Sequence, residues 1–372
     1  MRDSTKKQDA VVFLFKETTL REEALVTKGP AGFSLFGYPE FSEDGKAVEA
    51  LFGQASHFSI RVLAGLMRRL SRWWTGYSSN PQIVLTHLAT LRRAAGVVAT
   101  SNNVGIPLLL LKWIGVLNPP VFLVSVGLEA YRSDAGSSRC RRLARLFRKA
   151  ESVVVFSEDE RDFLLSRLGL PEDLVRSLPY GFDYRYFPKF RTVVPSFSEY
   201  HMVGADAQRD VELLKRWSER NPTLPVRCIV SRELVSRLPS VPRSWIIEED
   251  IPLQEVFLRL EGASSVVIPV KRNLYTAGTT FLIQSLAAGV PTLVARTGAL
   301  TRMSHAEPFP FLTYDPENLG SFESAMKRLR ELNREERKEM GKKSRAWVEQ
   351  WGDGRYLKQE LGDFIDRSVG RW

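Results

Sequence analysis

The stretch Ser265–Arg296, SVVIPVKRNLYTAGTTFLIQSLAAGVPTLVAR, decides the fold class of this chain. Its first part, Val266–Ile268, is a short β-branched run that a proline ends, which is typical of a buried strand. After a loop, apolar residues recur at helical spacing until Gly289 and Pro291 end the helix. A second strand is predicted at Thr292–Ala295. Two strands joined by a helix need a crossover connection, so the stretch predicts a parallel sheet.

The helix of this stretch begins with a glycine and hydroxyl-bearing residues, TAGTT at Thr276–Thr280. A helix N-terminus that follows a strand offers free backbone N–H groups and the positive end of the helix dipole to an anion. Gly278 would let a diphosphate approach the backbone closely. The pattern therefore predicts a phosphate site, and the alternative interpretation is an ordinary N-cap at Thr279 or Thr280.

The sequence TAGTTFLIQSLAAGVP at Thr276–Pro291 resembles the signature helix of the retaining GT-B glycosyltransferases, the large family 4 group. Thr276 and Gln284 stand at the positions of two glutamates in that family. There the first glutamate contacts the donor sugar, and the second holds the ribose hydroxyls. The resemblance thus assigns Thr276 to the catalytic site and Gln284 to the ribose, as a neutral hydrogen-bonding group.

Two further segments extend the resemblance. The segment Leu178–Asp183, LPYGFD, followed by Phe187 and Pro188, is similar to the end of the N-terminal domain in that family. In the family, the glycine after the first strand of the next domain precedes basic residues that hold the donor diphosphate. Gly204 and Arg209 match these positions, so the resemblance assigns both to the diphosphate.

Arg209 is also the candidate catalytic group beside Thr276. A guanidinium forms bidentate bonds with phosphate oxygens and can neutralise the charge of a departing diphosphate. The remaining donor-site candidates are Lys271, Ala277, Gly278, Thr279 and Thr280. From the residues alone, a surface ion pair of Arg209 with Asp206 or Glu212 is an equal alternative.

The resemblance implies an α/β fold of the GT-B class, in which two Rossmann-like doubly wound domains face each other across a cleft. The N-terminal acceptor domain is expected at 1–190 and is joined by the C-terminal helix at 355–372. The nucleotide-sugar donor domain is expected at 198–354, after a linker at 190–198 that contains Pro195.

The remaining elements are predicted from hydrophobic spacing and from turn residues. Further strands are predicted at 10–15, 33–38, 96–100, 121–125, 152–157, 200–204, 226–231 and 245–247. Helices are predicted at 46–52, 58–74, 107–117, 139–150, 205–217, 253–260, 322–332, 334–350 and 355–368, with 82–93 either a strand or a helix. Glu248–Asp250 are predicted to form an acidic turn.

Composition places the chain among globular proteins of two or three domains. It has 372 residues, 44% of them hydrophobic and 10% aromatic, which is ample for packed cores. The two cysteines, Cys140 and Cys228, are far apart, so neither a disulfide framework nor a zinc site is indicated, and a reducing, cytoplasmic compartment fits. The apolar run near the N-terminus is too short for a signal peptide or a membrane span.

The net charge of +10 calls for a polyanionic partner, and the charge is clustered. Ser59–Trp74 and Arg139–Lys149 are arginine-rich, contain no acid and carry apolar residues at helical spacing. Such basic amphipathic helices suit an anionic membrane surface, so peripheral binding to the inner face of the cell membrane is expected. Two solvated helix faces with ordinary apolar undersides are the alternative. No nucleic-acid recognition motif accompanies the charge, so nucleic acid is not an expected partner.

We therefore interpret the chain as an enzyme that moves a sugar from a nucleotide-sugar to a glycan or lipid-linked acceptor, with retention of configuration. The nucleotide diphosphate-sugar is a substrate, and no cofactor is expected. No Asp-x-Asp pair is present, so a metal-independent reaction is expected. The alternatives are a catalytically silent partner subunit of the same fold, which the neutral Thr276 and Gln284 favour, and a basic membrane- or polyanion-binding protein.

Overall fold

The computed structural model describes residues 10–16, 35–53, 57–128, 136–178, 180, 199–204, 208–238, 240–273, 277–297, 300, 308–351 and 354–370. The chain divides into two compact units, one of Met1–Leu178 with Gly354–Trp372 and one of Pro179–Asp353. Each unit has its own sheet of six parallel strands. The predicted linker at 190–198 lies outside the described residues, so the predicted domain limits stay a prediction.

The first unit has the strand order β2-β1-β3-β4-β5-β6. Its strands are β1 (Val11–Leu14), β2 (Val48–Leu51), β3 (Gly96–Ala99), β4 (Val121–Val124), β5 (Ser152–Val155) and β6 (Val175–Ser177). The strands β1, β3, β4 and β5 are buried along their whole length. A parallel strand that helices cover on both faces has no side exposed to water, so its sequence is a nearly continuous apolar run. The sequences of these four strands follow this pattern.

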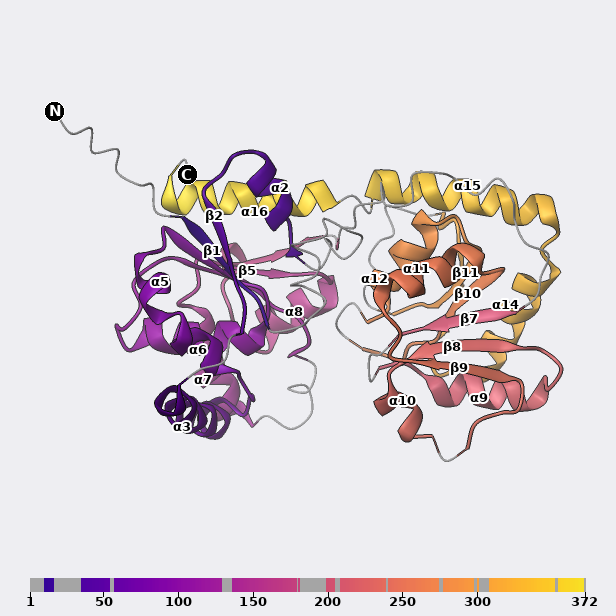
Figure 1. The fold of residues 1–372 in the computed structure, drawn as a ribbon, viewed down its shortest axis with the longest axis horizontal. Helices are drawn as coiled ribbons and strands as arrows, with labels where there is room; N and C mark the ends of the chain where they lie inside the picture. The colour runs from indigo at the N-terminus through magenta and orange to yellow at the C-terminus, as the bar shows by residue number, and fades with distance from the viewer. Residues whose placement is uncertain are drawn as a thin grey trace. The chain divides into compact units, whose positions relative to one another are not determined.

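Helices cover both faces of this sheet. They are α2 (Tyr38–Glu43), α3 (Phe58–Thr75), α4 (Pro81–Thr86), α5 (Leu88–Arg93), α6 (Asn102–Trp113), α7 (Ser137–Phe147), α8 (Glu158–Ser166) and α16 (Gly354–Val369). Figure 1 shows α2 and α16 on one side of the sheet and α3, α6 and α7 on the other. The C-terminal helix α16 packs against α2, so the end of the chain completes the first unit.

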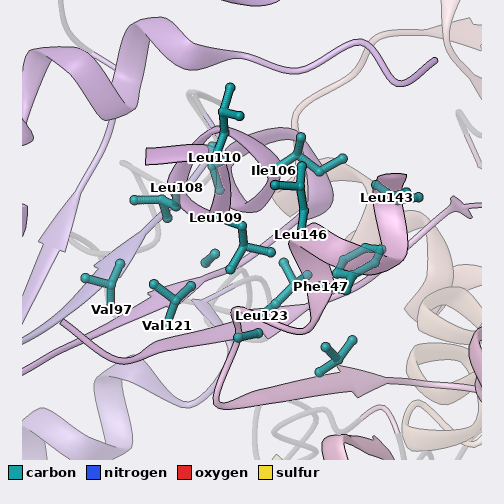
Figure 2. Close-up of a cluster of buried hydrophobic side chains, with 14 of the residues drawn as sticks. Val97, Ile106, Leu108, Leu109, Leu110, Val121, Leu123, Leu143, Leu146 and Phe147 are labelled. Atoms are coloured by element: carbon teal, nitrogen blue, oxygen red, sulfur yellow. The ribbon is translucent and has the colours of Figure 1, made fainter. Parts of the chain in front are cut away.

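A large hydrophobic core of the first unit lies between the sheet and α6 and α7 (Figure 2). Leu109 of α6 and Leu146 and Phe147 of α7 meet strand residues such as Leu123 there. The helix α6 can approach the sheet because Gly105 has no side chain: a Cβ at this position would lie 2.3 Å from Cδ1 of Leu123.

The second unit has the strand order β12-β11-β10-β7-β8-β9. Its strands are β7 (Tyr200–Val203), β8 (Val226–Val230), β9 (Trp245–Glu249), β10 (Ser265–Ile268), β11 (Thr292–Ala295) and β12 (Leu312–Tyr314). The chain starts in the middle of this sheet, runs to one edge through β9, and returns through β10 to the other edge. This is the Rossmann order, and it reverses between β7 and β10.

Helices again lie on both faces of this sheet. They are α9 (Val211–Arg220), α10 (Arg232–Ser236), α11 (Leu253–Gly262), α12 (Thr279–Ala287), α14 (Leu319–Glu331) and α15 (Arg334–Trp351). The helix α12 packs with α15, and α9 packs with α14. The crossover unit predicted from Ser265–Arg296 is confirmed, because β10 and β11 pair in parallel with Val266 opposite Thr292.

Three predicted elements are wrong. The segment 46–52 contains the edge strand β2 and no helix, because pairing of Val48 with Val11 decides the structure of a short and half-exposed sequence. Leu35–Tyr38 is not a strand. Tyr38 instead begins α2, which follows the left-handed Gly37 and buries Phe41 against Phe13. Glu248 and Glu249 lie in β9 rather than in a turn.

The start of α6 also differs from the prediction. The helix begins at Asn102 and includes Pro107, whereas the sequence suggested a start at the proline. A proline inside a helix leaves the carbonyl four residues before it without its usual donor. Here that carbonyl belongs to Asn103, and it accepts a hydrogen bond of 2.8 Å from the backbone N–H of Asn80. Tertiary contact thus compensates for the missing helical bond.

Candidate functional site

The candidate site lies in the second unit, where β7 and β10 end side by side. These two strands pair in parallel, with Ser265 opposite Tyr200. They are also the strands at which the strand order reverses. In doubly wound sheets, ligands bind outside the carboxyl ends of the strands at such a reversal point. The topology therefore directs attention to the loops after Val203 and Ile268.

Backbone hydrogen bonds hold these two loops together. The N–H of Asp210 donates to the carbonyl of Pro269 at 3.0 Å, and the N–H of Lys271 donates to the carbonyl of Gln208 at 2.9 Å. Arg209 and Val270 form an antiparallel bridge between them. The start of α9 and the approach to α12 are thus fixed to each other through the backbone.

The side chain of Arg209 lies against two glycines. Its Nε donates to the carbonyl of Val203 at 3.1 Å, and only 5% of the residue is exposed. A Cβ at Gly204 would lie 2.0 Å from Nε of Arg209, and a Cβ at Gly278 would lie 2.9 Å from its Nη1. Both glycines also have positive φ, +146° and +86°. The structure thus brings Gly204, Arg209 and Gly278 together, and it contradicts a surface position for the arginine.

The first turn of α9 adds a buried carboxylate next to this arginine. Asp210 is the N-cap of α9, and its Oδ1 accepts from the N–H of Leu213 at 3.1 Å. Burial raises the pKa of Asp210, while the bond from Leu213 and the charge of Lys271 act in the opposite direction. Asp210 and Arg209 are both buried, and the exposed Lys271 adds a positive charge near Asp210.

The N-terminus of α12 begins at a glycine and has no N-cap side chain of its own. Its N-cap is Gly278, which has no side chain to accept a hydrogen bond from the first turn. The alternative of an N-cap at Thr279 or Thr280 is therefore wrong. Ala277 and Gly278 are buried, and the two threonines are half-buried. Uncapped backbone N–H groups at the positive end of a helix are favourable for an anion.

Gln284 lies one turn further along α12 and is fully buried. Neither its Oε1 nor its Nε2 has a hydrogen-bond partner. A buried primary amide without partners is costly, by about 1–3 kcal/mol for each unsatisfied group. The amide is thus a neutral polar group on an apolar helix face. Its oxygen can accept a hydrogen bond from a ligand that reaches it, and its nitrogen can donate one.

Among the remaining predicted residues, Thr276 lies outside the described part of the chain. Lys271 is exposed at the start of the loop before α12. Two buried residues near this loop, Asn273 and Tyr314, are not among the residues predicted for the site. Asn273 donates from Nδ2 to the carbonyl of Lys271 at 2.8 Å, and its Oδ1 has no partner. Burial raises the pKa of Tyr314, and the charge of the nearby Asp210 raises it further.

The positions of both residues in the sequence, after or at the end of a strand, would have indicated them as site candidates. Asn273 follows β10 and Tyr314 ends β12, so both stand at the carboxyl ends of strands, where parallel sheets bind ligands. No group of three or more histidine, cysteine or acidic side chains that could hold a metal ion occurs among the described residues. The chemistry of the site is that of a buried guanidinium, an open helix N-terminus and neutral amides. Such a set can bind an anion and stabilise negative charge that develops on it.

Solved structures of glycosyltransferases and related enzymes have a similar fold. The structure of Anabaena Alr3699/HepE in complex with UDP and glucose matches with a TM-score of 0.67 and 11% identity, over 96% of this chain and 100% of that chain. Sucrose-phosphate synthase from Thermosynechococcus elongatus matches with a TM-score of 0.70 and 14% identity, over 96% and 98%. A glycosyltransferase from Rickettsia africae matches with a TM-score of 0.63 and 12% identity, over 98% and 100%.

No protein-family model matches the sequence, and no curated protein matches it either. At identities of 11–14%, the likeness to solved structures concerns the fold. It extends over nearly all of this chain and of the matched chains, so it includes both units. The predicted α/β class is confirmed, and the chain has the GT-B fold of these glycosyltransferase structures.

Proposed function

We propose that this chain is a glycosyltransferase that takes a sugar from a nucleotide-sugar and transfers it to a glycan or lipid-linked acceptor. The observation that carries the proposal is the placement of Arg209 between Gly204 and Gly278 at the reversal point of the second sheet. The structures with the same fold support it, because HepE was solved with UDP and with UDP-glucose.

In the proposed reaction, the donor diphosphate lies at the N-terminus of α12, against the backbone of Ala277, Gly278, Thr279 and Thr280. Glycine at 278 allows the close approach, and the helix dipole and Arg209 stabilise the charge that the departing diphosphate acquires. The exposed Lys271, in the loop before α12, adds a positive charge that attracts the diphosphate. The leaving group is thus stabilised by protein groups, without a metal ion.

In this proposal, the neutral Gln284 and Thr276 perform the roles of the two glutamates at these positions in the family that the sequence resembles. The buried amide of Gln284 bonds the ribose hydroxyls, which would give both of its unpaired polar atoms a partner. Thr276 lies next to the transferred sugar, and the sugar keeps its anomeric configuration. The proposed compartment is the cytoplasm, where two buried free cysteines are stable.

A catalytically silent subunit is the second candidate. The residues that favour it are Thr276 and Gln284, because neither can carry the negative charge of the glutamates that the resemblance places there. Such a subunit would bind the nucleotide through the same arginine and helix. It would differ from the enzyme only in turnover.

Incubation with a panel of nucleotide-sugars and simple acceptors tests the proposal, with the product anomers identified by NMR. We expect transfer with retention, and a fall of about 10²–10³ in turnover for Arg209→Ala, the usual effect of one electrostatic group. Arg216→Ala is the matched control, since this arginine of α9 is exposed. A loss below about threefold for Arg209→Ala would remove it from the site. Nucleotide binding without any turnover would support the silent subunit instead.

A further inference from the structure

The helix α3 (Phe58–Thr75) exposes its apolar face. The described residues include eleven exposed large hydrophobic side chains, and six of them lie on this helix: Phe58, Val62, Leu63, Leu66, Leu70 and Trp73. Phe58 is 74% exposed and Trp73 is 69% exposed. In helical projection the six residues form one stripe along the helix. Figure 1 shows α3 at the edge of the first unit, beside α7.

The inward side of α3 combines small and polar residues with Met67 and Trp74, which are partly buried against the core. Its buried residues are Ala64, Ser71 and Thr75. The hydroxyl of Thr75 donates to the carbonyl of Ser71 at 2.7 Å, and the hydroxyls of Ser71 and Ser79 are 3.3 Å apart. Surface helices normally turn their apolar stripe toward the core. The predicted alternative of ordinary apolar undersides holds for α7, whose Leu143, Leu146 and Phe147 are buried in the core, but α3 also carries a large apolar stripe on its outward side.

The apolar surface continues onto the end of a second helix. Trp113 and Ile114, at the end of α6, are 47% and 54% exposed. Trp113 contacts Trp74 of α3, with ring centroids 5.1 Å apart. Eight of the eleven exposed large hydrophobic side chains thus belong to one surface of the first unit, which we name the α3 face: the six residues of α3 with Trp113 and Ile114.

Basic residues flank the α3 face and no acid lies on these helices. The sequence from 57 to 128 contains no aspartate or glutamate. Within α3, the basic residues are Arg61, Arg68, Arg69 and Arg72, all exposed. The adjacent α7 exposes Arg139, Arg141 and Arg145. A helix with one apolar face, arginines beside it and a tryptophan near its end has the composition of helices that lie in the interface of a bilayer.

We propose that the α3 face is a membrane-binding surface, with α3 lying parallel to an anionic bilayer. Its apolar stripe enters the boundary between head groups and acyl chains, and the arginines contact the lipid phosphates. This inference does not depend on the reaction that the second unit performs. No helix among the described residues is long and apolar enough to cross a membrane.

Charge argues against a second copy of the chain as the occupant of this surface. Two α3 helices packed face to face would bring four arginines against four arginines, with no acid on either helix. Like charges at short range destabilise such a contact. An anionic lipid surface, by contrast, matches both the apolar stripe and the arginines.

Sedimentation with lipid vesicles tests the proposal, with phosphatidylserine-containing vesicles compared with pure phosphatidylcholine vesicles at low salt. We expect binding to the anionic vesicles that falls by about 100-fold when Arg68, Arg69 and Arg72 become glutamine, at about fivefold for each charge. The matched control replaces Arg216, Arg243 and Arg328 by glutamine, because these arginines of the second unit are exposed. This control should bind as the unchanged protein does.

The apolar stripe has a separate test. Leu66→Ser with Trp73→Ser should lower vesicle binding by at least tenfold, because two inserted side chains are lost. The control Leu258→Ser changes an exposed leucine of α11 and should have no effect. Brominated lipids should quench tryptophan fluorescence in the unchanged protein, and less in Trp73→Phe. Equal binding to neutral and anionic vesicles, no effect of the stripe variants, or a stable dimer in ultracentrifugation that these variants dissociate would overturn the proposal.

Discussion

The two units have closely related sheets, but the basic side chains of α3 and α7 in the first unit differ in their surroundings from those at the edge of the second sheet. In the second unit, basic side chains are paired with acids: Arg227 lies 2.8 Å from Glu199 and also contacts Glu248, which Arg259 approaches to 3.2 Å. The first unit has ion pairs as well, such as Arg161 with Glu172 at 2.6 Å, but none is found between the arginines of α3 or α7 and a described acid. The second unit also keeps a charged group inside, at Arg209. The first unit leaves its charge and its apolar residues outside.

This difference indicates that the sheet determines where a ligand binds, whereas the residues of the loops and helices determine which ligand binds. Both units place loops at the carboxyl ends of parallel strands, yet among the described residues only the loops after β7 and β10 hold a buried arginine against two glycines. The comparison predicts separable functions, with small anionic ligands at the second unit and an extended anionic surface at the first. Fold likeness alone could not assign either function.

The largest effect is expected for Gly204→Ala, which tests whether the functions of the two units are separable. The added Cβ would lie 2.0 Å from Nε of Arg209, at a φ of +146° that side chains rarely adopt. We expect Arg209 to move and turnover to fall by about 10²–10³, as when one electrostatic group is lost. Gly262→Ala is the control, because nothing lies within 4 Å of its Cβ position. Vesicle binding should be unchanged in both variants, and a shared loss would show that the two functions are coupled.

A smaller effect is expected for Gln284→Met, which removes the buried amide and keeps the volume. Because neither polar atom of Gln284 has a partner, the melting temperature without ligand should rise by about 2–4 °C. Affinity for the nucleotide should fall by about tenfold, as one hydrogen-bonding group is lost. The neighbouring Ile283→Met should be neutral or destabilising. If Gln284→Met lowers the melting temperature and leaves nucleotide affinity unchanged, the amide has only a structural role.

The smallest effect concerns the buried acid at the start of α9. The helix α6 of the first unit begins with the uncharged Ser101, whereas α9 begins with Asp210. Burial raises the pKa of Asp210 in the folded state, so its ionised form is disfavoured there. Its contribution to stability is therefore greatest at low pH and declines as pH rises from the unfolded pKa through the folded one.

Asp210→Asn keeps the N-cap and removes this pH dependence. In urea unfolding, the stability of the variant relative to the unchanged protein should increase between pH 4 and pH 7. A relative decrease over the same range would mean that the charge of Lys271 and the bond from Leu213 outweigh burial.

How much of this the sequence could predict depends on the strength of the local pattern. The crossover unit at Ser265–Arg296 was predictable, because long apolar periodicity, glycine and proline agree there. The strand β2 and the start of α6 were not, since pairing with Val11 and the bond from Asn80 decide them. In the site, Arg209 was found by resemblance, but its contacts with Gly204 and Gly278 arise from loops that meet only in the folded sheet.

The orientation of α3 was likewise beyond the sequence. Periodicity shows that a helix has an apolar stripe, but only the packing of Ser71 and Thr75 inward shows that the stripe faces outward. The basic character of α3 and α7 was predictable from the run without acids.

The central claim, that the loops after β7 and β10 bind the diphosphate of a nucleotide-sugar, is tested most directly by thermal shift. The unchanged protein and Gly204→Ala are each heated with a panel of nucleoside diphosphates. At about 100 times its dissociation constant, a ligand adds about 2.7 kcal/mol to the unfolding free energy, so one base should raise the melting temperature of the unchanged protein by several degrees. Gly204→Ala should show little or no shift. No shift of the unchanged protein with any nucleoside diphosphate would contradict the account.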